Sequence, residues 1–229
     1  MFKLTNLLKR LWEHRIEEKK VIPYIKKEHT EKMAGSQEEI DEFKIDIQMS
    51  RGSKNYKVLH DLLIENPESS TGYSHIDHVV ITPYGIFVIE TRYEQGIIYG
   101  SRECKFWLIN GNVKMVNPLF QNDGIINALK NCMEHKYGEK IVSLVSFSKQ
   151  CTLKVDMNLR NVKADECVMY DVNVNESIQR KISYEQMLHK APKLTEYEIA
   201  YLYHRFKEAN ITKTVMNEQI HERLKHKTS

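Results

Sequence analysis

The segment that most constrains the fold runs from Ile76 to Arg92 and reads IDHVVITPYGIFVIETR. Two apolar segments rich in β-branched residues, Ile76–Ile81 and Ile86–Ile89, flank a short stretch that contains Pro83 and Gly85. Runs of this composition form strands, and proline and glycine favour turns between them. The segment therefore predicts an antiparallel hairpin of two short strands around one tight turn.

The length of the turn predicts which residues of the hairpin face each other. If residues 82–85 form a four-residue turn, Ile81 faces Ile86, and counting outward puts Asp77 directly across from Glu90. Opposed residues of an antiparallel pair lie on the same face of the sheet, with Cβ atoms about 5 Å apart. We therefore expect two carboxylates to meet at one end of a largely apolar hairpin.

A cation joins this pair, because Arg92 lies two residues beyond Glu90 and so shares its face. Two adjacent carboxylates repel unless a proton or a metal lies between them. Oxygen ligands suit a hard divalent cation such as Mg²⁺, and such a site can assist phosphodiester cleavage. The alternative is a surface hairpin that ends in a cluster of acids and bases, since a one-residue bulge would separate Asp77 from Glu90.

Histidines beside the pair add a second metal option. His75 and Asp77 share a strand face, whereas His78 points to the other face. Imidazole ligands favour zinc, copper or iron over magnesium. We expect His78 to pack within the sheet.

Further residues extend this pattern, and together they resemble the nuclease-related domain, NERD, a branch of the PD-(D/E)xK restriction-endonuclease-like superfamily. The likeness covers roughly residues 36–150, and its matching residues are Tyr56–Asp61, Ile76–His78, Tyr84–Arg92, Gly96–Gly100, Trp107 and Asn117–Gln121. It implies an α/β fold with a central mixed sheet flanked by helices, and hydrolysis of DNA with Mg²⁺ or Mn²⁺. By this resemblance Asp77 and Glu90 would be the metal ligands.

Arg92 departs from the family pattern, because it occupies the position of the superfamily's active-site lysine. Lysine can orient the attacking water and can lose a proton, whereas arginine stays protonated and presents a planar fork. Arg92 could bind a phosphate or stabilise developing charge, but it could not act as a base. The alternative to a nuclease is a non-catalytic module that binds nucleic acid or a protein partner and retains the fold.

Two more side chains are candidates through the resemblance. The superfamily often adds a carboxylate from a preceding helix, and Glu42 fits the local spacing best, with Glu39 as the second choice. Gln121 matches another polar position of the family site. The alternatives are that the acids of residues 38–42 form the solvated face of an amphipathic helix, and that Gln121 is a polar residue near a helix start.

We expect the 229 residues to divide in three: an amphipathic helical arm at 1–34, the nuclease-like core that the resemblance implies at 35–150, and an extension with strands and helices at 151–229. The net charge of +3 does not by itself indicate nucleic-acid binding. The cysteines are widely spaced, without a CxxC pair, which predicts reduced thiols. Because no apolar run reaches the length of a transmembrane helix and no signal core is present, we expect a cytoplasmic protein.

Both ends of the chain predict helices. Residues 2–22 place apolar side chains and a tryptophan at helical spacing among basic residues, so this helix could pack on the body, dock to a protein partner or lie on an anionic membrane surface. Residues 195–198, TEYE, form a capping box that opens a helix to about Ala209, and a further helix is expected at 214–227. The sequence does not determine the oligomeric state.

Overall fold

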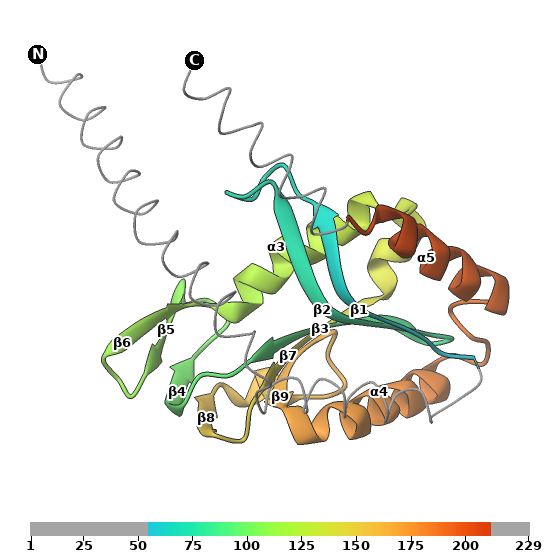
Figure 1. Cartoon of the computed structure of the whole chain (residues 1–229). Coiled ribbons are helices and arrows are strands. Elements are labelled where there is room, and N and C mark those ends of the chain that lie inside the picture. Colours follow the sequence, from blue (N-terminus) through green and yellow to red (C-terminus); the bar gives the residue numbers. More distant parts are fainter. Residues whose placement is uncertain (1–54, 212–229) are drawn as a thin grey trace, which may run out of the picture. The chain divides into compact units, whose positions relative to one another are not determined.

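The computed structural model describes residues 55–211, which form a mixed α/β unit with two mixed sheets and flanking helices (Figure 1). The predicted N-terminal arm, the acid-rich helix before residue 50 and the helix at 214–227 lie outside the described residues. Among residues 55–211, no helix is long and apolar enough to cross a bilayer.

The first sheet has five strands in the order β1-β2-β3-β7-β9. The strands are β1 (Lys57–Glu65), β2 (Tyr73–Thr82), β3 (Gly85–Arg92), β7 (Ile141–Phe147) and β9 (Glu166–Tyr170). The first three are antiparallel, whereas β7 and β9 continue parallel to β3. The inner strands β3 and β7 are almost entirely buried, as expected for apolar runs covered on both faces.

The second sheet has four strands in the order β6-β5-β4-β8. The strands are β4 (Gly96–Gly100), β5 (Phe106–Ile109), β6 (Val113–Val116) and β8 (Cys151–Val155). Gly100 is required here, because a Cβ at this position would lie 2.2 Å from the ring of Trp107. The Trp107 ring in turn stacks on Phe147 of the first sheet, with centroids 6.2 Å apart and planes inclined by 11°.

Helices cover both faces of the first sheet (Figure 1). The helices α3 (Pro118–Asn131) and α5 (Glu196–Ala209) share a core cluster with β1, β2 and β3, and α4 (Val174–Leu188) packs on the opposite face. The chain also forms 3₁₀ turns at His135–Lys140, Met157–Arg160 and Asp171–Asn173. The predicted capping box of α5 is confirmed, since the Thr195 and Glu198 side chains each bond the other's backbone N–H.

A side-chain cap sets the bounds of α3. The helix begins at Pro118, because Asn117 caps it by accepting a hydrogen bond from the N–H of Leu119 and proline suits the first helical turn. It ends at Asn131, and a separate 3₁₀ turn follows. Residues 151–170, which we assigned to the C-terminal extension, supply β8 and β9, one strand to each sheet.

Candidate functional site

The hairpin β2–β3 sets the position of the candidate site. Its predicted register is confirmed: Ile81 pairs with Ile86, and the pairing continues outward to His78 and Ile89. The Thr82 hydroxyl closes the turn, since it accepts the N–H of Tyr84 and donates to the carbonyl of Gly85. The paired residues end there, one position before Asp77 and Glu90, whose opposition stays a prediction.

Asp77 is a buried carboxylate, 8% exposed, held by specific partners. Its Oδ2 accepts the backbone N–H of Thr91 at 2.7 Å, and its Oδ1 lies 3.3 Å from Nδ1 of His75. Burying an ionised carboxylate is costly unless hydrogen bonds replace the water that it loses. These contacts fix Oδ2 of Asp77 against the backbone of β3 and Oδ1 against the His75 ring.

His75 links Asp77 to a second aspartate. Its Nε2 lies 2.6 Å from Oδ1 of Asp61 on β1, so the imidazole ring stands between two carboxylates. The β1–β2 register pairs the residues on either side, His60 with His78 and Leu62 with Ile76, and the backbone of Asp61 has a left-handed φ of 51°. Aspartate tolerates this conformation better than most residues. Asp61 and His75 therefore restrain the Asp77 side chain from the β1 side.

Arg92 ends β3, and its guanidinium bonds polar side chains. Its Nε donates to Oε2 of Glu94 at 3.4 Å, and its Nη2 donates to Oε1 of the same carboxylate, which makes a two-pronged ion pair. Nη1 donates to Oε1 of Gln121 on α3 at 3.3 Å. The side chain of Arg92 is 10% exposed. The structure thus brings Arg92 and Gln121 together, and Glu90 stands two residues before Arg92 on the same strand.

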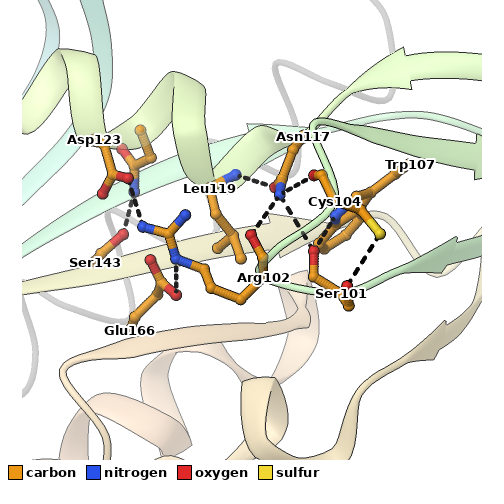
Figure 2. Close-up of polar contacts among 10 residues, drawn as sticks. Ser101, Arg102, Cys104, Trp107, Asn117, Leu119, Asp123, Ser143 and Glu166 are labelled. Atoms are coloured by element: carbon orange, nitrogen blue, oxygen red, sulfur yellow. Dashed lines mark hydrogen bonds and ion pairs between the residues drawn. The ribbon is translucent and has the colours of Figure 1, made fainter.

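The start of α3, which carries Gln121, is tied to the loop that joins β4 to β5 (Figure 2). The Asn117 amide donates to the carbonyls of Ser101, Arg102 and Cys104 at 2.8–3.2 Å. The Arg102 guanidinium bonds Asp123 of α3 at 2.6 Å and Glu166 of β9 at 2.9 Å. Burial raises the pKa of the Glu166 carboxyl. These contacts join both sheets to α3 and hold Gln121 at the end of β3.

Within residues 55–211, no three His, Cys, Asp or Glu side chains form a group that could hold a metal ion. Glu42 and its alternative Glu39 lie outside the described residues. Asp77 and Glu90 offer carboxylate oxygens, which are the donors that Mg²⁺ and Mn²⁺ prefer. A third protein ligand from the acidic run before β1 stays a prediction.

Sequence reasoning missed two residues that contact the candidate site residues, Glu94 and Asp61. Glu94 lies only two residues after Arg92, but β3 ends at Arg92, so the alternation of strand side chains does not extend to it. Asp61 gave no signal either, since its position depends on the register between β1 and β2, which are separated by the turn segment 66–72. His75 was considered as a transition-metal ligand, and the structure places it between two aspartates.

The fold and these polar side chains define an α/β protein with a buried aspartate on the β2–β3 hairpin and a paired arginine at the carboxyl end of β3. Comparison with known proteins agrees with this class: residues 34–148 match the family described as nuclease-related domain, NERD. A Bacillus anthracis protein described as uncharacterized is 30% identical over 161 residues, which span 69% of each chain. The chain belongs to the nuclease-related domain family.

A solved structure also aligns with the chain. It is the crystal structure of AF1548, a protein of unknown function, which has 6% sequence identity and a TM-score of 0.29. The alignment covers 73% of this chain and 95% of that one. Similarity at this level carries no argument about the fold or function.

Proposed function

We propose that the chain is a nuclease that hydrolyses DNA phosphodiesters with Mg²⁺ or Mn²⁺ on a restriction-endonuclease-like core. The observation that carries the proposal is the register of the β2–β3 hairpin, which runs outward to His78 and Ile89, the residues next to Asp77 and Glu90. Family membership supports it, because that hairpin lies within the matched residues 34–148. The reaction adds one water at phosphorus and breaks one P–O bond, which leaves a phosphate monoester and a hydroxyl.

The donor set fits a hard cation. Asp77 and Glu90 would hold it, with Glu42 as the further acidic ligand that the resemblance implies. A bound divalent ion would neutralise charge on the phosphate and lower the pKa of water. Asp77 already has one oxygen fixed by the N–H of Thr91, so its orientation does not depend on the metal.

Arg92 takes the cationic role at the scissile phosphate in this proposal. A guanidinium has five N–H donors and can bind more than one acceptor at once, so Glu94 and Gln121 can orient it while it faces a phosphate. Arginine cannot take a proton from water at ordinary pH. The proton of the attacking water must therefore pass to another base, for which solvent or the phosphate itself is available.

His75 and Asp61 act as positioning residues in the proposal. They restrain Oδ1 of Asp77, whereas the N–H of Thr91 restrains Oδ2. Side chains that orient a ligand typically change metal affinity or activity 10- to 100-fold when they are removed. We expect His75→Ala to raise the metal concentration needed for half-maximal cleavage by about that factor, and His75→Gln to restore part of the loss.

One observation favours a second function, a non-catalytic module that binds nucleic acid or a protein. The Arg92 guanidinium is engaged by Glu94, and an arginine in an ion pair is less available to a phosphate than a lone lysine. In that case the fold persists without the chemistry. Divalent-metal binding discriminates the two functions, because the enzyme needs the ion and the binding module does not.

The test is a cleavage assay on linear, circular and single-stranded DNA, with and without Mg²⁺ or Mn²⁺. We expect metal-dependent cleavage by the wild type, and its loss in Asp77→Asn and Glu90→Gln. The matched control is Glu176→Gln, which removes an exposed acid of α4 paired with Arg180 and should leave cleavage unchanged. Binding without cleavage by the wild type would favour the second function, and equal cleavage by wild type and Asp77→Asn would reject the proposed site.

A further inference from the structure

The outward face of the second sheet carries aromatic and basic side chains side by side. The ladder aligns Lys114 of β6, Leu108 of β5, Tyr99 of β4 and Lys154 of β8 in one row across the sheet. In the neighbouring row, Phe106 pairs with Val116. We call these six residues the aromatic face.

The opposite side of the sheet explains why these residues point outward. The alternate positions Ile98, Trp107, Met115 and Leu153 are buried in the core cluster that joins the two sheets. Because side chains alternate between the faces of a strand, their neighbours point away from that core. Phe106 is 43% exposed and Val116 is 46% exposed, although both are large apolar side chains.

Lysine ammonium groups lie beside both rings of the aromatic face. The Nζ of Lys105 lies 5.5 Å and that of Lys114 lies 6.0 Å from the centre of the Phe106 ring. The Nζ of Lys154 lies 5.6 Å from the Tyr99 ring. Such contacts are weak at exposed sites, so a stacking group can displace an ammonium from the ring without removing it from the neighbourhood.

We propose that the aromatic face binds a segment of single-stranded DNA, with bases stacked on Phe106 and Tyr99 and phosphates paired with the surrounding lysines. The inference deepens the proposed nuclease function and rests on it for the identity of the ligand as DNA. Aromatic rings accept any base through stacking, and cations beside them follow the backbone. Duplex DNA keeps its bases inside the helical stack and offers no such faces to a sheet.

Charge distinguishes this ligand from a protein partner. Ile97 and Thr152 also point outward from these strands. Neither they nor the six residues of the aromatic face are acidic. A chain of phosphates satisfies lysines at both edges of the face, Lys114 and Lys154, at once. A second copy of the same face would bring like charges together, which is unfavourable.

A short connection in the chain joins Arg92 of the candidate site to β4, which carries Tyr99 of the aromatic face. β4 begins at Gly96, four residues after Arg92, so the two Cα atoms lie within about 14 Å of each other. The side chains of Gln95 and Gln150, in the segments just before β4 and β8, bond at 2.7 Å. A strand of DNA held on the second sheet therefore needs a short path to reach the end of β3.

The test measures binding separately from cleavage. Fluorescence anisotropy of a labelled oligothymidine is titrated with the full chain in EDTA, and a duplex of the same length serves as competitor. We expect Phe106→Leu to weaken binding by about 5- to 100-fold, because the apolar surface remains and the stacking surface is lost. Phe106→Tyr should bind like the wild type, since it keeps the ring. Lys114→Gln should reduce the salt slope by about 0.7.

The matched controls are Tyr197→Leu and Lys190→Gln, which change an exposed aromatic and an exposed lysine outside the second sheet. Both should bind oligothymidine like the wild type. Equal binding by Phe106→Leu and wild type would overturn the inference, as would displacement by the duplex at equal concentration. A dimer in sedimentation that Phe106→Leu dissociates, with DNA binding unchanged, would assign the face to self-association instead.

The outcome is independent of the proposed chemistry, because EDTA removes the metal. Binding that depends on Phe106, without any cleavage when Mg²⁺ is restored, would support the aromatic face and contradict the nuclease. Cleavage of single-stranded DNA that is unaffected by Phe106→Leu, together with unchanged binding, would support the nuclease and overturn the aromatic face.

Discussion

Replacing Asp77 separates its structural role from its proposed metal role. In the folded chain its Oδ2 accepts the buried N–H of Thr91 at 2.7 Å. Asp77→Ala removes this acceptor and leaves the N–H without its partner, whereas the side-chain oxygen of asparagine in Asp77→Asn can still accept it. Both substitutions remove the charged oxygens on which the proposed metal site depends. The two variants should therefore differ in stability but agree in their response to metal.

The magnitudes follow from these contacts. Loss of a buried hydrogen bond to a charged group costs about 1.5–3 kcal/mol, so Asp77→Ala should lower the free energy of unfolding by that amount in EDTA. For a chain of this size, 2 kcal/mol corresponds to a fall in Tm of about 4–8 °C. Asp77→Asn keeps a neutral hydrogen bond worth about 1 kcal/mol and should lose about half as much. A divalent ion at about ten times its Kd should stabilise the wild type by about 1.4 kcal/mol.

The assay is thermal unfolding of the wild type, Asp77→Asn and Asp77→Ala in EDTA and in increasing Mg²⁺ or Mn²⁺. We expect the wild-type Tm to rise with metal and both variants to show no rise. Glu176→Gln is the control for loss of a surface acid and should respond like the wild type. A metal-dependent rise of equal size in Asp77→Asn would refute the reasoning, because the ion would then bind without this carboxylate. Equal stability of the two variants in EDTA would refute the role of the Thr91 bond.

Three further predictions concern other parts of the chain. Arg92→Lys should keep or raise cleavage and Arg92→Ala should reduce it strongly in the same assay, since both basic side chains supply a cation at the phosphate; equal cleavage by wild type and Arg92→Ala would contradict this role. Gly100→Ala should destabilise the second sheet by about 1–3 kcal/mol in urea unfolding, because the added Cβ meets the Trp107 ring at 2.2 Å. Thr195→Ala should cost about 1 kcal/mol through loss of the α5 cap. The Thr195 N–H lowers the pKa of the Glu198 carboxyl, so the capping contribution should be present above the ordinary glutamate pKa and lost as pH falls through the folded value, a loss that urea unfolding at low pH would detect.

The sequence by itself determined the features that depend on local geometry. The pairing of Ile81 with Ile86 follows from the length of one tight turn, and the same count predicts Asp77 across from Glu90 without any knowledge of the rest of the fold. The capping box at Thr195 is equally local, because its partners lie three residues apart. Within a hairpin or a helix turn, sequence spacing converts directly into distance.

Tertiary structure alone decided which distant residues join these local units. Asp61 reaches His75 through the β1–β2 register, and Gln121 reaches Arg92 because the Asn117 cap and the Arg102 ion pairs set the position of α3. The outward row of the second sheet forms because β8 pairs in parallel with β4, whose residues lie more than fifty positions earlier in the chain. Such pairings are chosen by the burial of whole faces in a shared core, and no short segment carries that information.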